Sequence, residues 1–195
     1  WTDTDGDGIR ECNGCTTGAP DGYKMEMEFI TYAEYGEALN LTQQYIAEGL
    51  KQIGIATNLS VVEGSVLWAA STDGGIEQSG NFDMDLYDDG YAGTDPTDFL
   101  WSYYHSEAAT PDYGYNYGDW INEDFDALLD EAYTLDEEYR KELFCQMADI
   151  LEAELPEALL FTAINADAHS ARLLGVQSTT NDIVTWNAAD WTLGE

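Results

Sequence analysis

The pattern that most constrains this fold is a strand–helix–strand succession near the start of the chain. Residues 23–31 alternate apolar and charged side chains, which predicts a half-buried strand. Residues 39–53 carry apolar side chains at helical spacing and are followed by Gly54, so we expect a helix that ends there. Residues 56–62 are β-like in composition and predict a second strand. This alternation is typical of an α/β domain.

The remaining sequence continues the alternation. A strand at 82–87 ends in acidic residues, and Asp95 with Pro96 is typical of a helix start. Asn122 and Asp136 are suited to cap two further helices, the second of which ends at Pro156. The other expected elements are a short helix at 66–70, a helix body at 99–104, a buried strand at 159–164 and a strand at 166–174. Together they predict an α/β domain with a mixed β-sheet flanked by helices.

The charge of the chain restricts its partners. Its 195 residues include 39 Asp and Glu but 6 Lys and Arg, for a net charge of -33. Nucleic acid and anionic membrane surfaces are therefore excluded, because both are bound through clustered basic residues. With 44% hydrophobic residues the chain is expected to fold, as a secreted or extracytoplasmic protein or one from a salty habitat. It opens on Trp1 with no signal-peptide pattern, so we expect a processed product or an excised part.

The first eleven residues contain a calcium-loop pattern, D-x-D-x-D-G-x-x-E. Calcium takes six to eight oxygen ligands, and carboxylates at alternate positions converge on one ion. The expected structural site uses the carboxylates of Asp3, Asp5, Asp7 and Glu11 and the backbone carbonyl of Ile9. Gly8 permits the sharp turn, but the twelfth position is Gly14 where a full EF-hand has Glu. The alternative is an Asp-rich turn without an ion.

Cys12 and Cys15 form a C-x-x-C pair in this irregular acidic segment, residues 1–22. We expect a local disulfide, which is typical of an oxidising compartment. A thioredoxin-like pair is expected between a strand and a helix, and a zinc site needs four ligands. Cys145, His105 and His169 lie far away in sequence and show no ligand spacing.

No catalytic motif stands out. The chain lacks the G-x-S-x-G, P-loop and G-x-G-x-x-G patterns, which argues against a serine hydrolase or a nucleotide-binding enzyme. Asp88 and Asp89 follow a predicted strand, where ligands bind in open α/β sheets, although a solvated turn is the alternative. Aromatic clusters at 101–104 and 113–120 either line a cleft for sugar or peptide or pack in the core.

Several segments together resemble one protein family. Residues 82–85 fit its F-D-hydrophobic strand, 95–100 its D-P-x-x-F-L, and 116–129 its N-Y-x-x-(Y/W)-x-N-x-x-F-D-x-L-L. Further matching segments are 1–11, 46–55, 140–150, 155–156 and 159–161. The chain resembles the C-terminal lobe of the family 5 extracellular solute-binding proteins of ABC transporters, which bind peptides, oligopeptides and nickel.

This resemblance implies a fold, a function and partners. It implies a periplasmic-binding-protein-like II lobe at residues 23–195, whose tail at 175–195 packs on an N-terminal lobe outside this chain. Members of the family close two lobes over a solute and deliver it to ABC permease subunits, and they catalyse no reaction. The protein is expected in the periplasm or on the outer face of the cell membrane, lipid-anchored in its full-length form.

The resemblance also suggests where a solute binds. In peptide-binding members an Asp after the F-D strand takes the α-amino group, and Ala92 stands at that place here. Asp88 and Asp89 are expected to substitute for it, with Tyr91 and Glu63 as further contacts. The expected ligand is a peptide or another small polar solute. The alternatives are a calcium-stabilised extracellular interaction module with no small-molecule cleft and, less favoured, an acidic hydrolase with two facing carboxylates.

Overall fold

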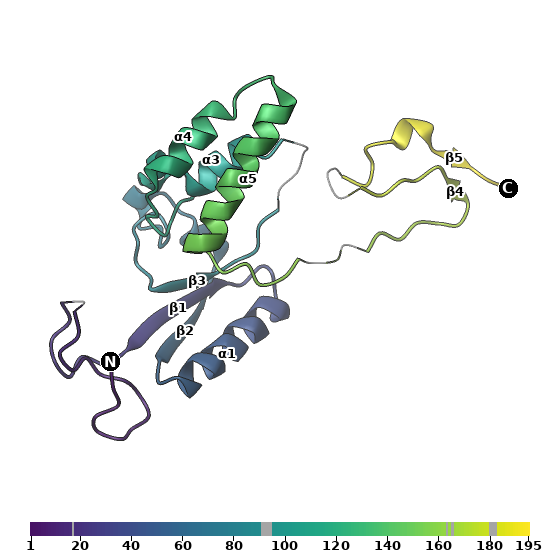
Figure 1. The fold of residues 1–195 in the computed structure, drawn as a ribbon. Helices are drawn as coiled ribbons and strands as arrows, with labels where there is room; N and C mark the ends of the chain where they lie inside the picture. Colours follow the sequence, from purple (N-terminus) through teal and green to yellow (C-terminus); the bar gives the residue numbers. More distant parts are fainter. Residues whose placement is uncertain (17, 91–94, 163, 165, 180–182) are drawn as a thin grey trace. The chain divides into compact units, whose positions relative to one another are not determined.

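The chain forms two compact units in a computed structural model that describes residues 1–16, 18–90, 95–162, 164, 166–179 and 183–195 (Figure 1). The first unit comprises Trp1–Asp89 and Thr110–Tyr113, and the second comprises Gly90–Ala109 and Gly114–Glu195. The acidic segment 1–22 therefore belongs to the same unit as the first strands.

A three-stranded parallel sheet organises the first unit. Strand β1 (Glu26–Tyr32) lies between β2 (Ala56–Val62) and β3 (Met84–Leu86). Helix α1 (Glu37–Gln52) connects β1 to β2 and packs along them, as expected of a parallel crossover (Figure 1). The short helix α2 (Gly64–Leu67) follows β2, and a 3₁₀ turn, Ser71–Asp73, comes next.

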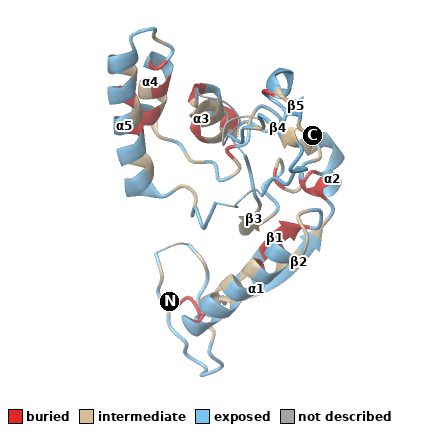
Figure 2. Cartoon of the chain, turned by 90° about the vertical axis from the view of Figure 1, so that its right-hand side faces the viewer, coloured by how far each residue is buried: buried red, intermediate tan, exposed pale blue. Residues whose placement is uncertain are grey.

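The core of this unit centres on β1, whose last four residues are all buried (Figure 2). Its buried members are Phe29, Ile30, Tyr32, Leu39, Leu67 and Leu86. The buried side-chain amide of Gln43 donates to the backbone oxygens of Phe29 (2.8 Å) and Ser60 (3.0 Å). This amide ties α1 to both strands and leaves no buried donor unsatisfied there.

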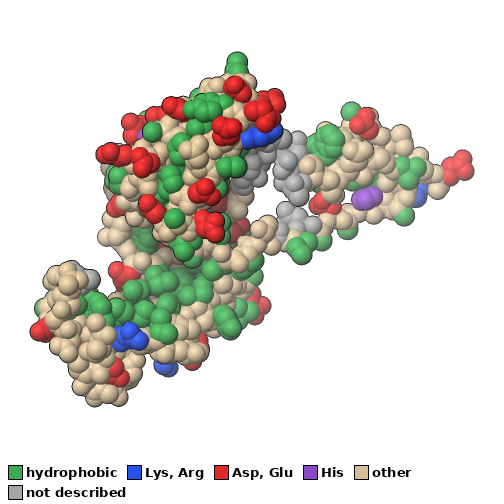
Figure 3. All heavy atoms as spheres, viewed as in Figure 1, with side chains coloured by type: hydrophobic (Ala, Val, Ile, Leu, Met, Phe, Trp, Pro, Cys, Tyr) green, Lys and Arg blue, Asp and Glu red, His purple; other side chains and the backbone are tan. Residues whose placement is uncertain are grey.

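The second unit packs its core between helices. It contains α3 (Thr97–Tyr104), α4 (Glu123–Glu131) and α5 (Glu137–Glu154), with a 3₁₀ turn at Ser106–Ala109. Their buried core includes Tyr104, Phe125, Leu129, Ala132, Leu143 and Met147. Acidic side chains are spread over the solvent side of these helices (Figure 3).

In the described part of the chain, no helix is both long and apolar enough to cross a membrane.

The predicted helix caps Asn122 and Asp136 are confirmed, whereas α3 begins at Thr97, one residue later than Asp95 and Pro96 indicate. Asn122 Oδ1 accepts from the Phe125 amide at 2.9 Å and Asp136 Oδ1 from the Tyr139 amide at 3.2 Å. The Asp95 side chain accepts from the Thr97 amide at 3.1 Å at the start of α3. The guanidinium of Arg140 pairs with that carboxyl and, with Thr97, lowers the pKa of Asp95.

The strand predicted at 159–164 is wrong for the residues that the structure describes in it. Residues 159–162 and 164 have no regular structure, and Leu159 and Ile164 are 88% and 94% exposed. An apolar run forms a strand when another strand pairs with it, and among the described residues no strand pairs with this segment. The strand predicted at 166–174 shortens to β4 (Leu173–Leu174), which pairs antiparallel with β5 (Thr192–Leu193).

The expected α/β fold is confirmed, but the described strands form a parallel sheet and a separate antiparallel pair instead of the expected mixed sheet. Among the described residues, antiparallel strand pairing is confined to β4 and β5, apart from two isolated bridges near the start of the chain, and the three-stranded sheet is parallel.

Candidate functional site

The carboxyl ends of the three parallel strands meet at one edge of the sheet. Tyr32 at the end of β1 pairs with Val62 at the end of β2, and Thr31 pairs with Leu86 at the end of β3. Ligands of open α/β sheets bind at this edge, because the loops after the strands converge there. We call the residues around it the carboxyl edge: Tyr32, Glu34, Glu63, Gly64, Trp68 and Asp88.

A tyrosine holds one of the expected ligand carboxylates at the carboxyl edge. The hydroxyl of Tyr32 donates to Asp88 Oδ1, and Tyr32 itself is 7% exposed. Burial, and then the hydrogen bond to Asp88, raises the pKa of Tyr32 well above its usual value. Tyr32 therefore remains a neutral donor at physiological pH. Its ring lies against Trp68, with centroids 4.7 Å apart, so the side chain has little freedom to move.

A second carboxylate at the carboxyl edge is bound by backbone. Glu34 follows β1, and its two oxygens accept from the Gly64 amide at 2.9 and 3.0 Å. Gly64 leaves little space for a side chain, since a Cβ there would lie 2.8 Å from the Trp68 ring. Glu63 precedes it at the start of α2, is exposed, and accepts from the amides of Val66 and Leu67 through its backbone oxygen.

The structure describes three of the residues that were expected to contact a solute. Asp88 and Asp89 are exposed two and three residues after the end of β3, and Glu63 directly follows β2, on the other side of β1. Tyr91 and Ala92 lie outside the described residues. Sequence reasoning missed Tyr32, Glu34 and Trp68 at this edge. The signal for Tyr32 and Glu34 was the end of the first strand, which continues one residue further than the alternation of residues 23–31 predicts. Trp68 follows α2, and the end of that strand gives no signal for it.

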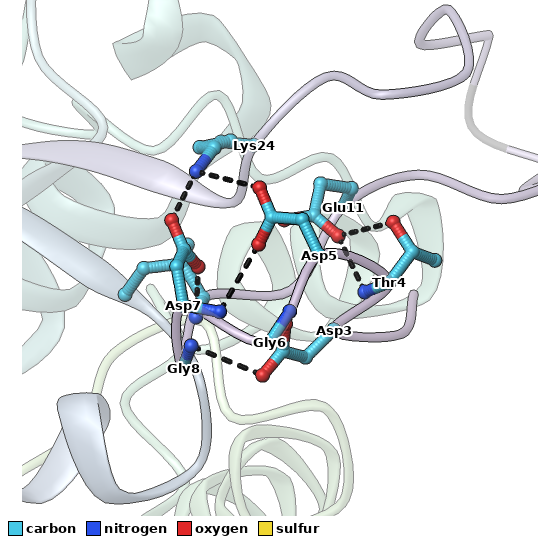
Figure 4. A network of polar contacts seen from close by, with 9 residues as sticks. Asp3, Thr4, Asp5, Gly6, Asp7, Gly8, Glu11 and Lys24 are labelled. Carbon is cyan, nitrogen blue, oxygen red and sulfur yellow. Dashed lines mark hydrogen bonds and ion pairs between the residues drawn. The ribbon is translucent and has the colours of Figure 1, made fainter.

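The acidic loop, residues 3–11, brings its carboxylates together (Figure 4). Asp3, Asp5, Asp7 and Glu11 each place one carboxylate oxygen within 4.8 Å of the others. The Asp3 carboxylate accepts from the Gly6 amide at 2.7 Å and from the Gly8 amide at 3.0 Å. These two glycines have φ of 81° and 91°, which other residues rarely adopt. The ammonium of Lys24 contacts Asp5 and Asp7.

The two nearby cysteines form a disulfide, Cys12–Cys15, directly after the acidic loop. Cys12 is buried, and its backbone exchanges hydrogen bonds of 2.9 Å with Tyr23 and Gly22. Cys145 is a free thiol on the exposed side of α5.

Solved structures of other proteins are similar to this chain. No curated protein matches the chain. The oligopeptide-binding protein AppA from Bacillus subtilis, solved with a nonapeptide, matches with a TM-score of 0.70 and 22% identity, over 100% of this chain and 35% of its own. NikZ from Campylobacter jejuni, solved with Ni(L-His), matches with a TM-score of 0.62 and 19% identity, over 89% of this chain and 34% of its own.

A further solved structure has a higher identity. The oligopeptide-binding protein from Thermus thermophilus, solved with a pentapeptide, has a TM-score of 0.59 and 29% identity, over 77% of this chain and 26% of its own. The chain therefore spans about a third or less of the length of these proteins. A family model described as "Bacterial extracellular solute-binding proteins, family 5 Middle" matches residues 1–111, more than half of the chain. The chain belongs to the family 5 bacterial extracellular solute-binding proteins.

Proposed function

We propose that this chain is the substrate-capture lobe of an extracytoplasmic receptor for an ABC importer, and that its solute is a peptide or another small polar molecule. Family membership supports the receptor role, and the oligopeptide-binding neighbours support the class of solute. The observation that carries the proposal is the Asp88 carboxylate, which Tyr32 holds at the carboxyl edge of the parallel sheet.

The chemistry of this edge favours a ligand with a free amino group. Asp88 and Asp89 follow β3 and Glu63 follows β2, so this edge carries negative charge that attracts an ammonium group. Trp68 is 43% exposed and offers an aromatic surface for an apolar side chain of the same ligand. We further propose that Tyr91 contacts the ligand. No step of this account requires catalysis.

The remaining partners belong to the same proposal. An N-terminal lobe closes over the solute by a hinge motion driven by contacts in both lobes. Residues 175–195 pack on that lobe, and the closed receptor engages the permease subunits. Full-length protein is held at the outer face of the membrane by a lipid anchor.

Isothermal titration calorimetry with short peptides tests the ligand class. We expect peptides with a free α-amino group to bind and N-acetylated peptides of the same sequence to bind at least tenfold more weakly. The double variant Asp88→Asn with Asp89→Asn is expected to remove this preference. A matched control is Asp149→Asn with Glu152→Gln, which makes the same change of charge at exposed positions of α5.

Two results would overturn the proposal. One is equal binding of free and acetylated peptides. The other is a lack of peptide binding by the folded chain at millimolar concentration, which would favour an interaction module without a solute cleft.

A further inference from the structure

We propose that the acidic loop is a structural calcium site, separate from the solute site at the carboxyl edge. Its ligands are the carboxylates of Asp3, Asp5, Asp7 and Glu11, joined by the backbone carbonyl of Ile9. Hard divalent cations such as calcium bind groups of carboxylate and carbonyl oxygens. Because exposed acidic clusters are common on a chain with a net charge of -33, the proposal depends on a further feature of this loop.

That feature is the buried carboxylate of Glu11. Its side chain is 3% exposed, unlike the three aspartates of the loop, which are exposed. One oxygen, Oε2, accepts from the amide and the hydroxyl of Thr4, each at 2.8 Å. The other oxygen, Oε1, is buried and accepts no hydrogen bond from any residue that the structure describes. Such an atom is rare in a native protein, because its lost hydration is not replaced.

A cation in the loop would replace that lost hydration. The Glu11 carboxyl lies within 4.8 Å of the three aspartate carboxylates, so one ion can contact all four groups (Figure 4). Burying a carboxylate is costly unless it is paired or coordinates a metal. Four negative charges at this spacing also repel one another, and a divalent cation offsets that repulsion directly.

Lys24 is the internal competitor for this site. Its ammonium contacts Asp5 and Asp7, and it places one positive charge against four carboxylates. Lys24 and Glu11 also form an isolated backbone bridge, so the lysine side chain can swing away without loss of the backbone pairing. Calcium and the Lys24 ammonium therefore compete for the same aspartate oxygens.

The position of the loop explains what the ion would stabilise. Glu11 forms backbone bridges with both Thr2 and Lys24, and the neighbouring Arg10 oxygen accepts from the Met25 amide at 2.7 Å. The Arg10 amide in turn donates to Gly54, just before β2, at 2.8 Å. Calcium at the loop would thus fasten the first eleven residues to the start of the parallel sheet.

Calorimetric titration of the chelator-treated chain with CaCl₂ in high NaCl tests this site. We expect one calcium ion per chain and a rise in melting temperature, because a ligand of the folded state stabilises it. Asp5→Asn with Asp7→Asn is expected to weaken binding at least tenfold, whereas Asp149→Asn with Glu152→Gln leaves it unchanged. Lys24→Gln is expected to tighten binding severalfold, a result that simple destabilisation of the loop cannot produce.

Three outcomes would overturn the proposal. The first is a set of several weak sites that both double variants affect equally. The second is Lys24→Gln that weakens binding or leaves it unchanged. The third is a melting temperature that responds to CaCl₂ no more than to NaCl. All these readouts are independent of peptide binding, so the failure of this site and the failure of the solute site are distinguishable.

Discussion

At the scale of single residues, the hydroxyl of Tyr32 connects the end of β1 to the segment after β3, because it donates to Asp88. We expect Tyr32→Phe to lower the free energy of unfolding at pH 7 by about 1 kcal/mol, measured by urea titration. Because the folded chain raises the pKa of Tyr32, its contribution is present below about pH 10, where free tyrosine is protonated, and is lost as the pH rises further. The difference between Tyr32→Phe and the unchanged chain should therefore shrink at high pH. Tyr23→Phe, at a 56% exposed position, is the control. A difference that grows above pH 10 would contradict this assignment.

Substitution by alanine at two glycines of the first unit is expected to change the stability of the chain in opposite directions. A methyl group at Gly64 would lie 2.8 Å from the Trp68 ring and 3.2 Å from Glu34 Oε1, whereas at Gly49 no atom lies within 4 Å. We expect Gly64→Ala to destabilise the chain by about 1–3 kcal/mol through overpacking. Gly49→Ala, at an exposed position in the last turn of α1, should stabilise it by up to about 1 kcal/mol. Urea unfolding followed by tryptophan fluorescence measures both, and two changes of the same sign would refute the packing described at Gly64.

At the scale of elements, the starts of α4 and α5 differ in what their capping residues do. The Asp136 side chain caps the start of α5. The Asn122 side chain caps the start of α4, and its amide nitrogen also donates to Glu154 at the end of α5 at 2.9 Å. We expect Asp136→Ala to cost about 1 kcal/mol and Asn122→Ala to cost more, because it removes two hydrogen bonds. Asp136→Asn keeps an acceptor and should cost little. Equal losses for the two alanine variants in urea unfolding would show that the bond to Glu154 contributes nothing.

Elements with local signals were predictable, and those that depend on distant partners were not. The strand predicted at 56–62 coincides with β2, and the caps at Asn122 and Asp136 were readable because capping is set by neighbouring residues. The run at 159–164 has the composition of a strand, but composition carries no information on whether another strand is available to pair with it.

At the scale of the whole molecule, one candidate site is built from neighbouring residues and the other from residues far apart in the sequence. The acidic loop is contiguous in sequence, so its four carboxylates could be named from spacing alone. The bond from Tyr32 to Asp88 spans 56 positions and depends on β1 lying beside β3, which no local pattern gives. Likewise Asp112 joins the first unit through its bonds to Ser71, a contact that spans 41 positions.

The most direct test of the central claim, that a solute binds at the carboxyl edge, is chemical-shift mapping of the isotope-labelled chain during titration with a short free-amine peptide. The account predicts shifts that saturate and that cluster at the ends of β1, β2 and β3, around Tyr32, Glu63 and Asp88. It also predicts their loss in Asp88→Asn with Asp89→Asn but not in Asp149→Asn with Glu152→Gln. Shifts scattered over acidic side chains of both units, or a cluster away from this edge, would contradict the account.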